Sequence, residues 1–265
     1  MEKIRKNKKV IAVFLIPAVL IYLCFELIPV VMSVYFSFND WPGLQAVPLK
    51  FVGFKNYSNL FHNAVFLKSL QNVLIYVVVS VILQVPIGFG LGLLIHHFKK
   101  GQRFFKAAFF IPMILSVTAV ALLWNFIYFP TDKGILNSLL IKIGLGNYIQ
   151  QWLVNPKTSL ICLIVVSTWT SVGYYMIICL AGLTSIPDSV LEAGELDGAT
   201  GWKKIWNLYI PMLWEPLKMS TIMVITGVLK IFDTVYILTP TGGTSNCTIV
   251  PALLMYNEAD RKSVV

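Results

Sequence analysis

Long runs of apolar residues separated by shorter polar segments dominate the pattern along the chain. A bilayer core about 30 Å thick needs roughly 20 apolar residues in a helix, so runs of that length with few charges predict membrane spans. Every backbone amide must be satisfied within its own segment in lipid, which makes such spans helical. Five spans are predicted, with approximate bounds at residues 10–36, 73–95, 107–129, 159–183 and 213–238. We therefore expect an all-α, polytopic transmembrane bundle that forms one domain over residues 1–265.

The composition agrees with this pattern and excludes several classes of site. Hydrophobic residues make up 57 % of the chain and charged residues 12 %, whereas soluble domains average about 45–50 % and about 25 %. Four widely spaced cysteines form no Cys-x-x-Cys pair, so neither a disulfide framework nor a metal site is predicted. The three histidines lie in or beside loops on opposite faces of the membrane, and we predict no catalytic residues.

The net charge of +9 matters through its placement. Five Lys and Arg residues precede the first span, and four more lie between His96 and Lys106. The positive-inside rule then places the N-terminus and the inner loop at residues 184–212 in the cytoplasm. With five spans, the C-terminus would lie outside.

The loop at residues 184–212 carries the most information. Pro187 is expected to end the fourth span, because its ring cannot continue a helix. Asp188 or Ser189 can cap a new short helix, and Gly198 offers a bend after it.

A second short helix is expected after that bend. Trp202, Ile205 and Trp206 recur at helical spacing, and Pro211 is predicted to stop the helix. The loop thus reads as helix, glycine bend and helix on the inner membrane surface.

At these residues the sequence resembles the membrane subunits of ATP-binding-cassette importers, whose inner loop carries the pattern E-A-A-x3-G-x9-I-x-L-P. Here Glu192-Ala193-Gly194 is followed by three residues, the last of them Asp197, then by Gly198 and, after nine more, by Leu208-Tyr209-Ile210-Pro211. Gly194 for alanine, Leu208 for isoleucine and Ile210 for leucine depart conservatively.

The resemblance extends over nearly the whole chain and points to the sugar-permease branch. The matching segments are Ser33–Phe38, Phe51–Tyr57, Phe110–Pro112, Trp124, Trp169, Gly173, Leu180–Leu183, Asp197–Ala199 and Phe232–Thr239. Permeases of this branch have a sixth helix after the outer Gly-Gly loop, whereas here the apolar stretch Thr248–Tyr256 is too short to span. We therefore expect a truncated or frameshifted product, or an incomplete deduced sequence.

The resemblance implies a multi-pass subunit of the bacterial plasma membrane with several partners. These are a second permease subunit in a heterodimer, two ATPase subunits, an extracellular sugar-binding protein and membrane lipid, without nucleic acid. ATP and Mg belong to the ATPase subunits, and this chain would bind no cofactor and perform no chemistry. It contains no Gly-x4-Gly-Lys-Ser/Thr phosphate loop. The loop residues that couple to the ATPase would be Glu192, Ala193, Gly194, Asp197, Gly198 and Pro211.

Polar groups inside the spans are candidates for the substrate path, because they are costly in lipid. Lys230 and Asp233 stand three residues apart, so they can pair on one helix face and, with Tyr236, line a sugar path. A structural ion pair toward the partner subunit is the alternative. Trp124 and Trp169 are weaker candidates, for which packing is the simpler interpretation.

Two other functions remain open at this point. The chain is a permease for another solute, such as an amino acid or a glycerophosphodiester, or it is a polytopic scaffold or enzyme whose inner loop matches by chance. The latter would need titratable groups clustered at one depth, which the sequence does not supply.

Overall fold

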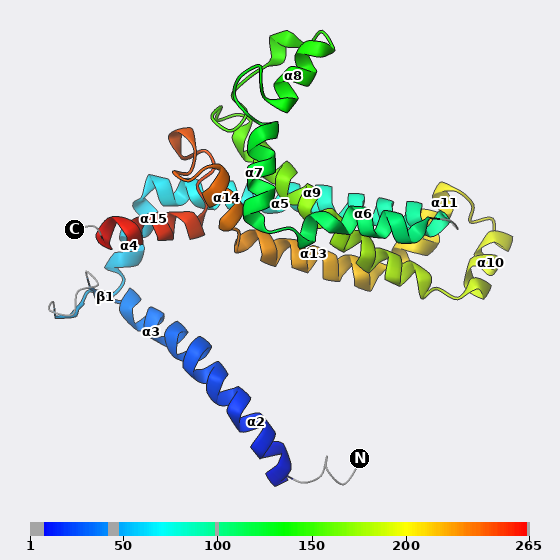
Figure 1. Cartoon of the computed structure of the whole chain (residues 1–265). Coiled ribbons are helices and arrows are strands. Elements are labelled where there is room, and N and C mark those ends of the chain that lie inside the picture. The colour runs from blue at the N-terminus through cyan, green and yellow to red at the C-terminus, as the bar shows by residue number, and fades with distance from the viewer. Residues whose placement is uncertain (1–7, 42–47, 99–100, 264–265) are drawn as a thin grey trace. The chain divides into compact units, whose positions relative to one another are not determined.

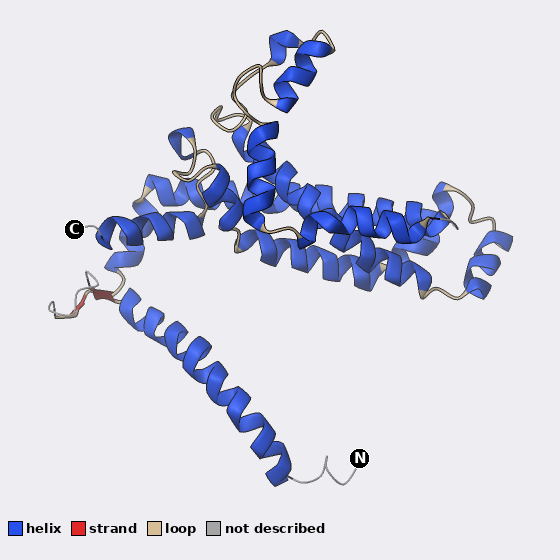
Figure 2. Ribbon diagram, in the orientation of Figure 1, coloured by secondary structure: helices blue, strands red, loops and turns tan. Residues whose placement is uncertain are grey.

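The computed structural model describes residues 8–41, 48–98 and 101–263. Part of the basic tail (residues 1–7) and Lys99 and Lys100 of the basic loop lie outside the described residues. Helices form nearly all of the regular structure (Figure 2), and the only strands in the described ranges are two residues long. The all-α class is confirmed. The chain divides into two units, Met1–Ala64 and Val65–Val265, which we describe separately.

The first unit is built on one long helical run. This run comprises α2 (Lys8–Tyr22), the π-helical segment η1 (Leu23–Leu27) and α3 (Ile28–Ser37). The wide π turn directly precedes Pro29, which has no N–H to donate to the helix. No described residue of its most apolar window is buried within this chain. Strands β1 (Asn39–Asp40) and β2 (Lys50–Phe51) then pair antiparallel, and α4 (Lys55–His62) follows.

The second unit holds the remaining elements, of which α5, α6, α9 and α13 lie lengthwise beside one another (Figure 1). In chain order they are α5 (Ala64–His97), α6 (Gln102–Ile114), α7 (Val117–Ile127), α8 (Ile135–Lys142), η2 (Gly146–Tyr148), α9 (Ser159–Thr184), α10 (Asp188–Leu196), α11 (Trp202–Lys204), η3 (Ile205–Tyr209), α12 (Ile210–Met212), α13 (Trp214–Leu229), α14 (Asp233–Leu238), η4 (Thr244–Asn246) and α15 (Pro251–Ser263). The short apolar stretch near the C-terminus therefore forms a helix that Pro251 opens.

Only three of the five predicted spans are single helices: Ala12–Ser37, α5 and α9. The run at 107–129 divides into α6 and α7, whose axes differ by 97°. Ser116 starts the new helix, because its side chain accepts a hydrogen bond from the Ala119 N–H at 3.2 Å. The predicted span at 107–129 is therefore helical but broken, and its bend was not predicted. Counting each bent pair as one span gives up to five.

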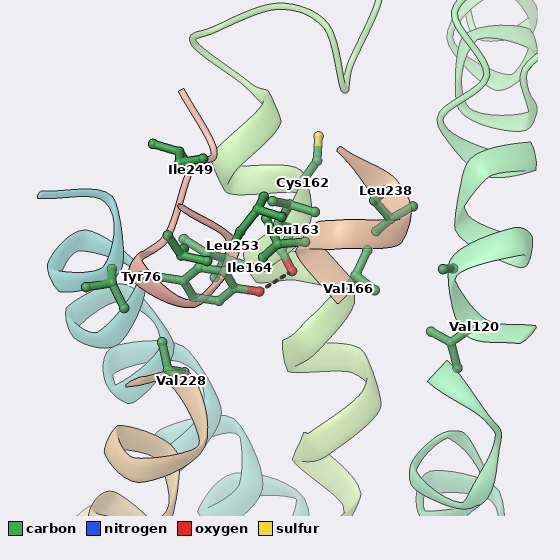
Figure 3. Packing of buried hydrophobic residues seen from close by; sticks show 14 of the residues in the cluster. Tyr76, Val120, Cys162, Leu163, Ile164, Val166, Val228, Leu238, Ile249 and Leu253 are labelled. Atoms are coloured by element: carbon green, nitrogen blue, oxygen red, sulfur yellow. Dashed lines mark hydrogen bonds between the residues drawn. The ribbon is translucent and has the colours of Figure 1, made fainter. Parts of the chain in front are cut away.

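Helices α5 and α9 run parallel, as two spans separated by one crossing should. The Tyr76 hydroxyl donates to the Leu163 carbonyl at 2.9 Å (Figure 3), and further along both helices Gly88 meets Tyr175 and Gly92 meets Cys179. The buried side chains around Tyr76 form the main core, into which α15 inserts Leu253.

Candidate functional site

The loop at 184–212 begins with α10, which starts one residue after Pro187. Proline fixes the backbone where the helix begins and blocks continuation of α9. Neither Asp188 nor Ser189 caps α10 as expected, because Pro187 itself occupies the N-cap position. Asp188 instead lies in the first turn, where the exposed N–H groups favour a negative charge.

Helix α10 has two faces with different environments. Val190 and Leu191 pack on a small core of Leu183, Ile186 and Leu213. The opposite face exposes three residues, Glu192, Ala193 and Leu196, and the side chain of Leu196 is 90 % exposed. No hydrogen bond or ion pair joins Glu192 to another residue in the part of the chain that the structure describes. We call Glu192, Ala193 and Leu196 the outer face of α10.

Gly198 ends α10 in a Schellman arrangement, as its position in the loop pattern requires. Its φ of 81° is left-handed and favours glycine. The Ala199 N–H donates to the Gly194 carbonyl at 2.8 Å, and the Gly198 N–H donates to the Glu195 carbonyl at 3.0 Å. These two bonds satisfy the last carbonyl groups of the helix and turn the chain back.

The second helix of the loop comprises α11, the π-helical η3 and α12, and runs continuously over Trp202–Met212. Pro211 lies in its last turn, so the helix ends one residue later than the proline alone predicts. The π turn immediately before it widens the coil where the proline lacks an N–H. Trp202 and Trp206 are 74 % and 64 % exposed.

The two loop helices touch at two points. Lys204 Nζ lies 2.6 Å from Glu195 Oε1, and this hydrogen bond raises the pKa of Lys204 above its ordinary value. Beside it, Leu208 covers Gly194: a Cβ on this glycine would lie 3.3 Å from Leu208 Cδ2. We call these four residues the clasp.

The polar candidates of the last apolar run do not share one helix. Lys230 caps the end of α13, and Asp233 begins the separate helix α14. The chain breaks between them at Phe232, whose φ of −137° and ψ of −61° are not helical. No ion pair links Lys230 and Asp233 within the described ranges, and both are exposed. The prediction that they lie on one helix face is wrong.

The aromatic candidates lie in two ring clusters. Tyr236 stacks on Phe232 at 5.3 Å between ring centroids and meets Tyr256 edge-on at 5.1 Å. Trp124 and Trp169 meet edge to face at 5.8 Å, and the buried indole N–H of Trp124 has no hydrogen-bond partner among the described residues. None of these residues lines the cavity described next.

A cavity of about 230 Å³ lies where the two broken runs meet α5 and α9. Leu115, at the break between α6 and α7, and Ile231, at the break between α13 and α14, both line it. Discontinuous helices of this kind often surround solute sites in transporters. Among the described residues, its polar lining comprises Gln84, Ser167, Thr170, Ser171, Tyr175 and Thr234, and no charged residue lines it.

These cavity residues are not among the sequence-based candidates, although α9 carries a signal for them. Residues 167–171 read Ser-Thr-Trp-Thr-Ser in the middle of an apolar run, and only Trp169 was singled out. Three of the hydroxyl side chains in this stretch line the cavity. A polar cluster at one depth of an apolar span is the feature that could have revealed them.

Comparison with known proteins identifies relatives over the whole chain. The family described as binding-protein-dependent transport system inner membrane component matches residues 84–262. The chain is 36 % identical to the probable ABC transporter permease protein YurN of Bacillus subtilis, covering 99 % of this chain and 89 % of that protein. It is 33 % identical to the lactose transport system permease protein LacF of Rhizobium radiobacter, covering 92 % and 81 %. A chance match confined to the inner loop is therefore excluded.

The fold also matches a solved structure. A bacterial ABC transporter involved in the import of the acidic polysaccharide alginate aligns with a TM-score of 0.82 at 23 % identity, covering 99 % of this chain and 87 % of the other. A second structure, an alginate ABC transporter in complex with a periplasmic protein bound to alginate pentasaccharide, aligns with a TM-score of 0.72 at 22 % identity. At these identities, the likeness establishes the fold.

Proposed function

The chain belongs to the family of binding-protein-dependent transport system inner membrane components, the permeases of ABC transporters, and from this premise we propose that it is the membrane subunit of an ATP-driven sugar importer. Several relatives are named for sugar transport, among them the lactose permease protein above and a multiple sugar-binding transport system permease protein of Streptococcus mutans, 30 % identical. Sugar is therefore the solute class we favour.

The outer face of α10 is the surface that we propose docks into a cleft of an ATPase subunit. Its residues are exposed and make no contact that the loop needs for its own fold, whereas the opposite face is packed. A short helix with an exposed apolar and acidic face suits helix-in-groove recognition. The loop and the N-terminus then lie in the cytoplasm, and ATP and Mg bind the ATPase partner. This chain contributes movement rather than covalent chemistry.

The remaining partners follow from the same proposal. A second permease subunit would complete the membrane pathway as a heterodimer, and an extracellular binding protein would deliver the sugar. The structural neighbour in complex with a periplasmic protein supports an assembly of this general kind.

The cavity is the part of the solute path that we propose this chain supplies. Hydroxyl and amide groups both donate and accept hydrogen bonds, which suits a sugar hydroxyl. The Gln84 side chain is 2 % exposed and takes part in none of the hydrogen bonds among the described residues, so its amide is available to a solute. The lining without charge favours a neutral sugar over an acidic one.

The docking proposal is tested by Glu192→Lys in the complete complex. We expect the variant to insert and fold normally, because Glu192 is exposed and makes no hydrogen bond or ion pair among the described residues. We also expect it to lose uptake of labelled mono- and oligosaccharides into vesicles. The control is His97→Lys, which adds positive charge at an exposed position at the end of α5, outside the loop sequence. Unchanged uptake by Glu192→Lys, or equal loss in both variants, would remove the assignment of the outer face.

A further inference from the structure

The clasp joins two helices that the backbone alone would leave free to turn against each other. Between α10 and the second helix stand two positive-φ glycines, Gly198 and Gly201. Glycine is the residue with the greatest backbone freedom, so this connection is a natural hinge. Side-chain contacts across it therefore decide whether the loop bends or moves as one body.

The polar half of the clasp is built around a partly buried lysine. The Lys204 side chain is 17 % exposed, and its partner Glu195 is 57 % exposed. Lys204 Nζ also lies 5.7 Å from the centroid of the Tyr209 ring, one turn further along the same helix. Lys203, its neighbour in sequence, is exposed and forms no ion pair in the described part of the chain.

The two contacts act together to prevent rotation. An isolated exposed ion pair stabilises too little to hold two helices on its own. Here the Glu195–Lys204 pair lies next to the contact of Leu208 with Gly194. One contact would let the two helices rotate about it, whereas two adjacent contacts fix the angle between α10 and the second helix of the loop. Glycine at position 194 lets Leu208 approach the α10 backbone.

A continuous path leads from the clasp to the cavity. At the 73° bend after Met212, the Leu213 N–H donates to the Tyr209 carbonyl at 2.8 Å and the Leu217 N–H to the Leu213 carbonyl at 2.9 Å. Leu213 is 1 % exposed in the small core, so the bend is packed. Helix α13 then places Val224 and Val228 in the cavity wall.

We infer that Lys204 is a positioning residue that locks α10 to the second helix of the loop, so that force on the outer face of α10 reaches α13 and the cavity. The inference rests on the proposed docking of that face. Lys204 itself contacts neither the ATPase nor the solute. Without it, the loop flexes at its glycines and absorbs the movement.

The first test measures flexibility directly, in the assembled complex. Spin labels at Ser189→Cys and Asn207→Cys, both exposed, report the distance between the loop helices in a Cys24→Ser background. We expect Lys204→Gln to widen the distance distribution about twofold, because one of two fixed points is lost. The matched control Lys203→Gln should leave the width unchanged. Equal widths in the two variants overturn the inference.

The second test measures coupling. In vesicles holding the complex, we expect Lys204→Gln to lower the sugar taken up per ATP hydrolysed about fivefold, while Lys203→Gln leaves the ratio unchanged. ATPase subunits should still co-purify, since the outer face is intact. The charge swap Glu195→Lys with Lys204→Glu should restore the ratio. An unaltered ratio in Lys204→Gln, or a swap that fails to restore it, refutes the locking role. Docking is tested separately by Glu192→Lys. If the outer face docks as proposed, this variant, unlike Lys204→Gln, should no longer co-purify with the ATPase subunits.

Discussion

The two halves of α5 contact the rest of the second unit through different residues, polar side chains in the first half and glycines in the second. Every fourth residue of the helix is buried along one row: Asn72, Tyr76, Ser80, Gln84, Gly88 and Gly92. Residues four apart form a continuous ridge on a helix. The first four members are polar and the last two are glycine, so the ridge changes from hydrogen bonding to close backbone contact halfway along. Pro86 lies at that change.

The difference shows how one helix can be both open and tightly packed. In the polar half, Tyr76 bonds the Leu163 carbonyl, Ser80 has no hydrogen-bond partner among the described residues, and Gln84 faces the cavity. In the glycine half, a Cβ at Gly88 would lie 2.8 Å from Tyr175 Cβ, closer than real Cβ atoms approach. The glycine half therefore packs α5 directly against the α9 backbone, and the polar half bonds α9 through Tyr76 and borders the cavity at Gln84.

The strongest way to break this contrast is Gly88→Ala. The added methyl group has to push the α9 backbone away, since Met176 N would lie only 3.2 Å from it. We expect a loss of stability of about 2 kcal/mol from overpacking, seen as a lower thermal midpoint of the purified complex in detergent. The control is Gly90→Ala on the same helix, where nothing lies within 4 Å of the added atom. Similar midpoints for both variants would contradict close packing in this half.

The next effect concerns the cavity and leaves stability intact. Gln84→Leu removes the only side-chain amide in the polar lining, and we expect uptake of labelled sugar to fall about tenfold, the equivalent of about 1.4 kcal/mol. The thermal midpoint should stay or rise, because a buried amide without a partner is costly. Gln71→Leu, at an exposed position on the same helix, is the control. A Gln84→Leu complex that transports normally would exclude the cavity from the solute path.

The smallest expected effect comes from Ser80→Ala. The Ser80 hydroxyl is buried without a partner in the described chain, so its removal should change stability by less than about 0.5 kcal/mol, in the favourable direction. Ser69→Ala on the same helix should cost about 1 kcal/mol, because Ser69 donates to the Phe66 carbonyl at 2.7 Å. Thermal midpoints of the two variants, measured side by side, check the order. A clear loss from Ser80→Ala would show that its hydroxyl has an essential partner.

Hydropathy was sufficient to predict the helices but not their bends. The runs at 107–129 and 213–238 are apolar on average, and a change of direction at Ser116 or Phe232 leaves their mean hydropathy unchanged. The cavity lies at those two bends, so its residues could not be located from the spans. For the same reason, the spacing of Lys230 and Asp233 was misleading: it holds only inside an unbroken helix.

The loop at residues 184–212 was more predictable, because its features are local. The residue after a helix often adopts a left-handed backbone conformation, which glycine tolerates best, and Gly198 occupies that position. Pro187, directly before α10, fixes where that helix starts. The clasp could not be predicted, because Lys203 and Lys204 are adjacent residues of the same type. Only the packing of the second helix turns Lys204, and not Lys203, toward Glu195.

The packed bend at Leu213 joins two helices of unequal length at a fixed angle, so together they form a bent lever. At about 1.5 Å per residue, the arm over Trp202–Met212 is about 17 Å long and α13 about 24 Å. If the bend turns as one body, travel scales with the ratio of the arms, so a displacement of about 1 Å at the Trp202 tip moves the Leu229 tip about 1.4 Å. In the docking proposed above, a small movement at the loop is thus enlarged toward the cavity, at proportionately less force.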